Sequence, residues 1–178
     1  FQEAVVNGKD YDVEVEILTA TGSLKWVRSI GISDIKDGKC KRIYGLFQDI
    51  HKRKEIEKAN REKHTLLETI LESIEVGVIS CDREGKLTSF NKATREWHGI
   101  PLEPIPPSDY SNHYGLFHMD GITPLEMEEI PLLQALYTGE VTNKEIIISP
   151  NNGPNRSIIA TGSQLVGEDG NVFGAVVA

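Results

Sequence analysis

The period of hydrophobic and polar positions changes several times along the chain. Between residues 11 and 17 every second side chain is apolar, and the intervening ones are acidic. A period of two is typical of a β-strand with one apolar face. From Gln48 to Ile74 there is neither Gly nor Pro, and apolar positions recur at intervals of three and four residues. This second pattern predicts one long helix.

The pattern after residue 75 predicts two strands, three short helices and three further strands. The strands are expected at VGVISC (76–81), Lys86–Phe90, Lys144–Ser149, Arg156–Thr161 and Val172–Ala178. The helix signals are an Asn91 cap with a Gly99 end, a Thr123–Glu126 capping box with Pro124 at its first helical position, and Pro131 with a Gly139 end. The expected fold class is α+β, with a five-stranded antiparallel sheet and short helices on one face.

The long helix contains a candidate dimer seam. Its positions alternate in spacing between four and three residues, as in a heptad repeat. We expect the chain to form a parallel homodimer through this linker helix. The alternative is a connector helix that packs on its own domain. The seam residues are Ile56, Asn60, Leu67, Ile70 and Ile74, with Lys63 in the same stripe.

An internal repeat divides the chain. Residues 1–34 align without a gap with residues 132–165, and the glycines at 8, 22 and 31 fall on those at 139, 153 and 162. Gly38 matches Gly170 after a slip of one residue, and Asp precedes both, as in tight hairpin turns. Glycines at one fixed offset indicate two copies of one architecture. The predicted domains are 1–50, a partial copy; 51–74, the linker helix; and 75–178, a nearly complete copy.

Composition excludes some classes of function. The net charge of −8 argues against a nucleic-acid partner, which would require a basic face. No apolar run approaches the ~20 residues of a membrane span, so no membrane contact is expected of this segment. Cys40 and Cys81 form no motif, and we expect free thiols in a reducing cytoplasm.

Several motifs of the chain resemble those of tandem PAS sensor domains. YGLFQDIHKRKE (44–55) is similar to the sequence that closes a PAS domain and opens the next signalling helix, although His51 stands where the family prefers Thr. DREGKLTSFNKA (82–93) is similar to the family's opening motif. PLLQALYTGEV (131–141) and GEDGNVFGAVV (167–177) are similar to its later helix and last strand.

The resemblance implies a sensory input module of a bacterial or archaeal signalling protein such as a sensor histidine kinase. An output domain would then follow in the same chain. The alternatives are the sensor of a diguanylate cyclase or transcriptional regulator, and a ligand-free module for protein interaction. The module itself is expected to be non-catalytic, because the sequence has no nucleophile elbow, P-loop or paired-cysteine metal motif. The acidic pair Glu128-Glu129 is interpreted as a solvated helix face rather than an acid–base couple.

Cofactor signals are weak. His98, His113 and His118 lie where some PAS proteins hold haem, but surface or loop histidines are the preferred interpretation. Flavin attachment needs a cysteine in the helix after the hairpin, and neither Cys81, in a strand, nor Cys40, in a turn, is placed there. We therefore expect no metal and no cofactor, with haem or flavin as the less favoured alternatives.

The apolar residues expected on the inner faces could line a small-molecule pocket, although for each of them singly an ordinary core position is the preferred interpretation. Asp49 and Ile50, at the junction of strand and helix, are candidate relay residues, and Asp49 is expected to cap the helix. The partial copy should expose an apolar sheet face that a preceding segment or a partner chain would cover. The pocket candidates are Val78, Trp97, Leu133, Leu136, Ile146, Ile148 and Ile159.

Overall fold

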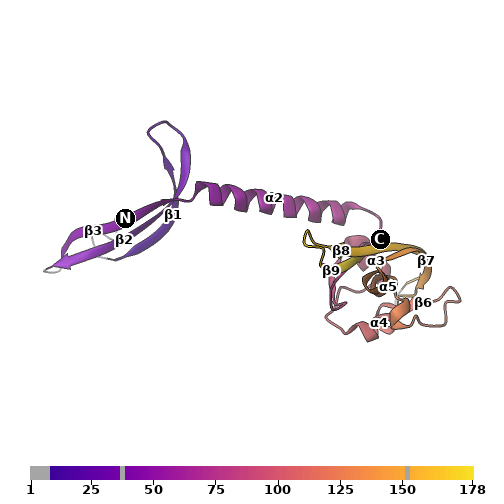
Figure 1. Ribbon diagram of the computed structural model, residues 1–178. Helices are drawn as coiled ribbons and strands as arrows, with labels where there is room; N and C mark the ends of the chain where they lie inside the picture. Colours follow the sequence, from indigo (N-terminus) through magenta and orange to yellow (C-terminus); the bar gives the residue numbers. More distant parts are fainter. Residues whose placement is uncertain (1–8, 37–38, 151–152) are drawn as a thin grey trace. The chain divides into compact units, whose positions relative to one another are not determined.

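The computed structural model describes residues 9–36, 39–150 and 153–178 (Figure 1). The chain separates into two compact units, residues 1–66 and 67–178. The boundary falls inside the long helix α2 (His51–Ser73), so each unit is described separately.

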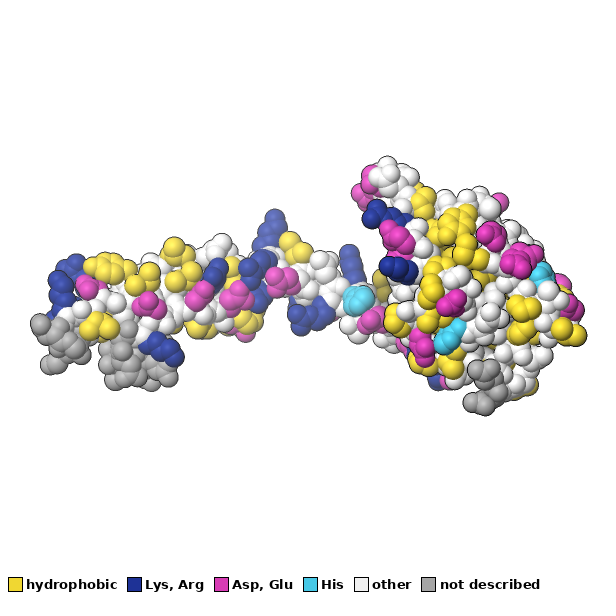
Figure 2. All heavy atoms as spheres, turned by 90° about the horizontal axis from the view of Figure 1, so that it is seen from below, with side chains coloured by type: hydrophobic (Ala, Val, Ile, Leu, Met, Phe, Trp, Pro, Cys, Tyr) yellow, Lys and Arg dark blue, Asp and Glu magenta, His cyan; other side chains and the backbone are white. Residues whose placement is uncertain are grey.

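The first unit is a three-stranded antiparallel sheet with the order β1-β2-β3. The expected alternating strand is present, and β1 pairs Tyr11 with Gly31, whose missing Cβ leaves room for the tyrosine ring. Val13 and Val15 remain 42% and 38% exposed, which agrees with the expected apolar sheet face. Apolar side chains are visible on its surface in Figure 2. The strands are β1 (Tyr11–Leu18), β2 (Leu24–Lys36) and β3 (Lys39–Asp49).

Helix α2 begins directly after this sheet. Asp49 accepts a hydrogen bond at Oδ1 from the backbone N–H of His51, at 3.0 Å, as expected of the cap. Ile50 is buried, and its N–H donates to the carbonyl of Trp26. The helix buries none of its residues and ends at Ser73, one residue before the last expected seam position.

The second unit is built on one antiparallel sheet with the strand order β5-β4-β9-β8-β7-β6. The five predicted strands are all present, and the two-residue β6 adds a sixth at the edge. Each neighbouring pair is antiparallel. The strands are β4 (Ile79–Asp82), β5 (Leu87–Phe90), β6 (Leu116–Phe117), β7 (Glu140–Ile148), β8 (Arg156–Val166) and β9 (Val172–Val177).

Short helices cover one face of this sheet (Figure 1). Asn91 caps α3 and Gly99 ends it in a left-handed conformation, while Pro131 and Gly139 bound α5, as the sequence predicts. The core lies between α5 and the sheet and contains Leu133, fully buried, and Ile146, 3% exposed. The helical elements are α3 (Lys92–His98), η1 (Pro107–Asp109), α4 (Tyr110–Tyr114), η2 (Met127–Glu129) and α5 (Pro131–Thr138).

Several local predictions were wrong. Thr123 does not cap a helix, because its N–H and hydroxyl both bind the Asp120 carboxylate, and the capping box instead joins Glu126 and Glu129. Strand β7 begins at Glu140 rather than at 144, since a bulge with Asn143 at φ 52° continues the ladder. Cys40 lies in β3 rather than in a turn. The expected Asp37-Gly38 turn falls outside the described residues.

Candidate functional site

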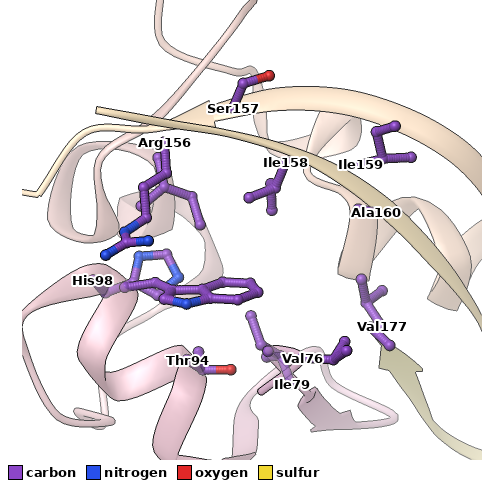
Figure 3. A pocket seen from close by; sticks show the side chains of 14 residues that line it. Val76, Ile79, Thr94, His98, Arg156, Ser157, Ile158, Ile159, Ala160 and Val177 are labelled. Carbon is purple, nitrogen blue, oxygen red and sulfur yellow. The ribbon is translucent and has the colours of Figure 1, made fainter. Parts of the chain in front are cut away.

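A cavity of about 480 Å³ opens between α3 and the inner face of the sheet in the second unit (Figure 3). Residues of β8 form one wall, and Thr94 and His98 of α3, with Ile79 of β4, form the other. The volume lies within the range of small-molecule sites, roughly 300–1,000 Å³. The lining residues are Val76, Gly77, Ile79, Thr94, Trp97, His98, Ile148, Arg156, Ser157, Ile158, Ile159, Ala160, Val177 and Ala178.

The walls are apolar because alternate strand residues point inward. On β8, Ala160 is 2% exposed and Ile158 is half-buried, and on β9 Val177 is 7% exposed. Trp97 supplies the aromatic surface of α3. Its ring packs against Gly77, where an added Cβ would lie 2.6 Å from Cζ3 of the indole. Any larger residue at position 77 would therefore displace the Trp97 ring.

Two polar side chains of α3 line the cavity, and both are engaged elsewhere. The Thr94 hydroxyl lies 2.9 Å from Asn91 Oδ1 and 3.2 Å from the carbonyl of Val78. His98 Nδ1 lies 2.8 Å from the carbonyl of Tyr114, so this nitrogen must carry a proton and donate it. Burial lowers the pKa of His98, against the raising effect of this hydrogen bond. His98 is therefore a neutral group of the wall.

His98 corrects a sequence prediction. We expected a surface or loop histidine, but His98 is 3% exposed and its ring stacks on Phe90 and meets the edge of Tyr114. The burial depends on a carbonyl sixteen residues away, which no local pattern indicates. His113 and His118 are half-buried and lie 3.3 Å and 2.9 Å from glutamate oxygens. Within the described residues no three His, Cys, Asp or Glu side chains cluster to hold a metal ion.

The structure separates the predicted pocket residues. Trp97 and Ile148 line the cavity. Leu133 and Leu136 of α5 and Ile146 of β7 do not line it, because they belong to the core between α5 and the sheet. Val78 is not a lining side chain either, and its backbone binds Asn91 and Thr94.

Ile159 is a predicted pocket residue and does line the cavity, but it lies on the outer face of β8 rather than on the inner face, where we expected it. Its side chain borders the cavity but is 60% exposed. The ladder pairs Ile146 with Ile158, which places Ile158 on the inner face and Ile159 on the outer one. Because the expected inward-facing positions on β8 were displaced by one residue, Ile158 and Ala160 were not among the predicted pocket residues, although both line the cavity.

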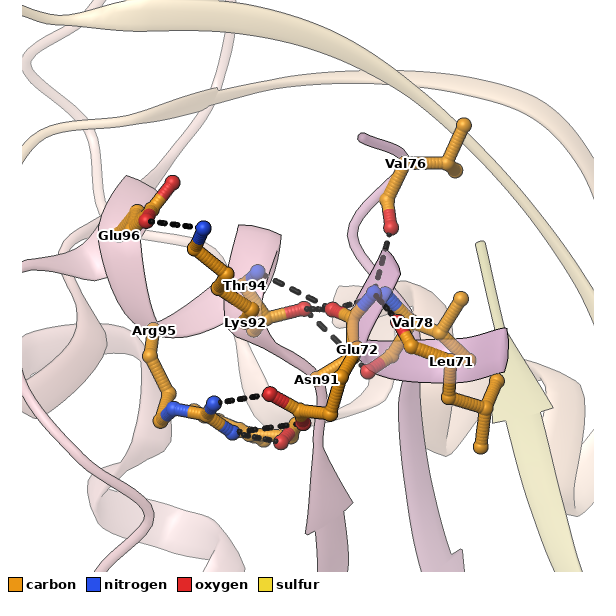
Figure 4. Close-up of polar contacts among 10 residues, drawn as sticks. Leu71, Glu72, Val76, Val78, Asn91, Lys92, Thr94, Arg95 and Glu96 are labelled. Carbon is orange, nitrogen blue, oxygen red and sulfur yellow. Dashed lines mark hydrogen bonds and ion pairs between the residues drawn. The ribbon is translucent and has the colours of Figure 1, made fainter. Parts of the chain in front are cut away.

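Asn91 joins the cavity wall to the end of α2 (Figure 4). Its Nδ2 donates to the carbonyls of Leu71, at 3.0 Å, and Val76, at 2.7 Å. Its Oδ1 accepts from the N–H groups of Val78, at 2.9 Å, and Thr94, at 3.1 Å. Asn91 is 2% exposed, so these contacts form a buried junction. The same side chain therefore caps α3 and holds the last turn of α2.

A charged contact lies beside this junction. The guanidinium of Arg95 binds the Glu72 carboxylate through two nitrogens, at 3.2 and 2.5 Å, and also donates to the carbonyl of Phe90 at 2.6 Å. The hydrogen bond from Arg95 lowers the pKa of Glu72. Both side chains are partly exposed, so this pair adds orientation rather than much stability.

The relay candidates lie in the first unit. Asp49 Oδ2 is 2.7 Å from Lys25 Nζ, and this hydrogen bond, followed by that from the N–H of His51, lowers the pKa of Asp49. Glu14 of β1 binds both Arg53 and Lys54 in the first turn of α2. The start of α2 is therefore attached to the sheet by the ion pairs of Glu14 and by the hydrogen bond from the His51 N–H to Asp49.

The expected dimer seam is open to solvent. Ile56, Leu67 and Ile70 are 52%, 60% and 47% exposed, and Leu66 is 60% exposed beside them. Ile74 is half-buried and lies beyond the helix. Apolar side chains of this kind on a helix that buries nothing favour a protein contact. Among helices in the described residues, none combines the length and apolarity needed to cross a membrane.

The fold of the second unit defines its class. A curled antiparallel sheet with a few short helices on one face, in this strand order, is a PAS-like α+β fold. No family model matches the chain.

Two curated relatives are similar in sequence. The hybrid signal transduction histidine kinase I of Dictyostelium discoideum is 24% identical over 134 residues, which cover 70% of this chain and 7% of that protein. The sensor protein FixL of Bradyrhizobium diazoefficiens is 28% identical over 116 residues, which cover 60% of this chain and 23% of that protein. The chain thus spans a small part of the length of either relative.

Among solved structures, the PAS domain of an HTR-like protein from Haloarcula marismortui is 16% identical, with a TM-score of 0.47. The match covers 70% of this chain and 98% of that one.

Proposed function

We propose that the second unit is the sensory input module of a larger signalling protein, with a sensor histidine kinase as the favoured kind. The sequence similarity to a signal transduction histidine kinase and to a sensor protein supports a role in signal transduction. In this proposal the module binds a small molecule in the cavity between α3 and β8. The module itself is non-catalytic, and its cytoplasmic location stays a prediction.

The proposal depends mainly on the double role of α3. One side of this helix lines the cavity through Thr94, Trp97 and His98. Its first turn is tied through Asn91 to the carbonyl of Leu71, in the last turn of α2. A ligand that displaced Trp97 would therefore also act on the attachment of α2. A binding energy that differs between two positions of α3 would become a change in the position of that helix.

In the same proposal, residues 1–50 are the C-terminal half of a first PAS domain. The internal repeat supports this assignment, because Val15 aligns with the buried Ile146 and Ser29 with the buried Ala160. The exposed Val15 would then be covered by a helical layer like that of the second unit. The exposed seam on α2 would form a homodimer, with Asp49 and Ile50 as relay residues at its start.

The test uses the full-length protein, with autophosphorylation as the assay if a kinase domain is present. Ala160→Leu places additional carbon atoms in the cavity, and Ser163→Leu adds the same side chain at an exposed position of the same strand. We expect Ala160→Leu to change the output by about fivefold or more, the range of ordinary coupling energies. Equal output from wild type and both variants, with Ala160→Leu folded, would contradict the proposal.

A second candidate is a protein-interaction module that binds no ligand. It is favoured by Ile159, which is 60% exposed on the outer face of β8. This candidate predicts that Ile159→Glu, rather than Ala160→Leu, changes the output and the state of association.

A further inference from the structure

The cavity has an apolar interior and one positively charged residue in its lining. Ile79, Ile148, Ile158 and Val177 supply aliphatic walls. The Thr94 hydroxyl and the Nδ1–H of His98 are already engaged with protein acceptors. Neither side chain can donate to a ligand without losing that bond. The interior therefore suits an apolar ligand body.

Arg156 is the charged residue. It is the first residue of β8, its side chain is exposed, and it lines both the cavity and an adjoining depression beside α3 (Figure 3). Within the described part of the chain, Arg156 makes no ion pair. An unpaired guanidinium at the edge of an apolar cavity is suited to an anion, and its planar fork matches a carboxylate.

Acidic side chains near Arg156 could compete with a ligand for its guanidinium. Glu72, Glu75 and Glu96 line the same depression. Glu72 is held by Arg95, and Glu96 lies 3.8 Å from Lys92 Nζ. Glu75 is thus the carboxylate that could compete with a ligand for Arg156.

We infer that the cavity binds a monocarboxylate with an apolar body, such as a medium-chain fatty acid, and that Arg156 holds its carboxylate at the edge. The inference rests on the proposed sensory function and adds the chemical class of its ligand. The aliphatic tail would lie against Trp97 and Ala160. The carboxylate would remain partly in solvent, where a charged hydrogen bond carries little desolvation cost.

The chain offers its own reporter for this binding. It has two tryptophans, Trp26 in the first unit and Trp97 in the cavity wall. In a Trp26→Phe background all tryptophan emission comes from Trp97. Decanoate and its neutral analogue decanamide are titrated into this protein, and the emission of Trp97 is recorded.

We expect saturable binding of decanoate, with decanamide weaker by about two- to fivefold, the usual value of a solvent-exposed ion pair. Arg156→Gln should lower the affinity for decanoate to that for decanamide. Arg83→Gln is the matched control, because Arg83 is exposed in the β4–β5 turn, pairs with Glu84 and does not line the cavity. Glu75→Gln should leave decanoate binding equal or tighter. Ala160→Leu should abolish the response of Trp97 emission to decanoate and to decanamide, and Ile158→Phe is a second variant that fills the cavity.

The outcomes separate this inference from the proposed function. Equal affinities for decanoate and decanamide, or an Arg156→Gln variant that binds decanoate as wild type does, would overturn the carboxylate assignment and leave the cavity as a sensory site. Absence of saturable binding of decanoate would also overturn it. Only an unchanged output of Ala160→Leu in the full-length protein would contradict the sensory function itself.

Discussion

Replacement of Asn91 tests the junction between the cavity wall and α2. Its side chain makes five hydrogen bonds within the second unit, to Leu71, Val76, Val78 and, twice, Thr94. Asn91→Ala removes all of them, whereas Asn91→Ser retains an oxygen that can cap α3. The two variants therefore separate the cap from the attachment of α2.

The magnitude follows from the groups left without partners. Loss of a helix cap costs about 1 kcal/mol. The carbonyls of Leu71 and Val76 and the N–H of Val78 each lose a partner at a partly buried position, at about 1 kcal/mol each. Asn91→Ala should therefore lower the free energy of unfolding of the second unit by about 4 kcal/mol, and Asn91→Ser by about 3 kcal/mol. Either loss is a large fraction of an ordinary domain stability of about 5–15 kcal/mol.

The assay is urea unfolding followed by Trp97 emission in the Trp26→Phe background, so that the second unit alone is observed. Lys92→Ala, next to Asn91 but exposed, is the control and should change little. A loss below about 1 kcal/mol for Asn91→Ala would show that the buried junction contributes no more than a surface cap, contrary to this prediction. An Asn91→Ser variant as stable as wild type would show that only the cap matters.

Three further predictions concern pH, association and relay. Burial lowers the pKa of His98, so the second unit should lose stability as the pH falls below about 6.5, where the unfolded chain takes up a proton more readily than the folded chain. The urea midpoints measured at pH 7.5 and at pH 5.5 should differ less in His98→Asn than in wild type. Leu67→Asp with Ile70→Asp should give monomers in sedimentation across a concentration series, since a dimer seam would bury unpaired charges; unchanged dimerisation would place the contact elsewhere. Asp49→Ala should change the output of the full-length protein while circular dichroism shows the sheet intact, and an unchanged output would leave Asp49 only a cap.

Local signals predicted much of the fold. The Asn91 cap, the Pro131 and Gly139 boundaries of α5 and the strand β1 depend on neighbouring residues, and all three appear in the structure. The Thr123 prediction failed because the Asp120 carboxylate competes for the same N–H and hydroxyl groups. Asp and Thr side chains bind nearby backbone groups both in turns and at helix N-termini, so the local sequence does not distinguish the two.

The site was less accessible from the sequence. Ile158 and Ile159 are equally apolar, and only the pairing of Ile146 with Ile158 decides which one faces inward. The second role of Asn91, at the end of α2, depends on carbonyls fifteen and twenty residues away. Arg156 gave no signal, because an exposed arginine is ordinary until a cavity is known to lie beside it.

Hydrogen exchange at the end of α2, measured when the cavity is filled, tests the coupling between the cavity and this helix. Exchange is measured by mass spectrometry for peptides that cover residues 67–73 in wild type, Ala160→Leu and the outer-face control Ser163→Leu. We predict that Ala160→Leu changes exchange there by about fivefold or more, that Ser163→Leu does not, and that Asn91→Ser removes the response. If Ala160→Leu changes the emission of Trp97 but leaves exchange in residues 67–73 as in wild type, the cavity is not coupled to α2.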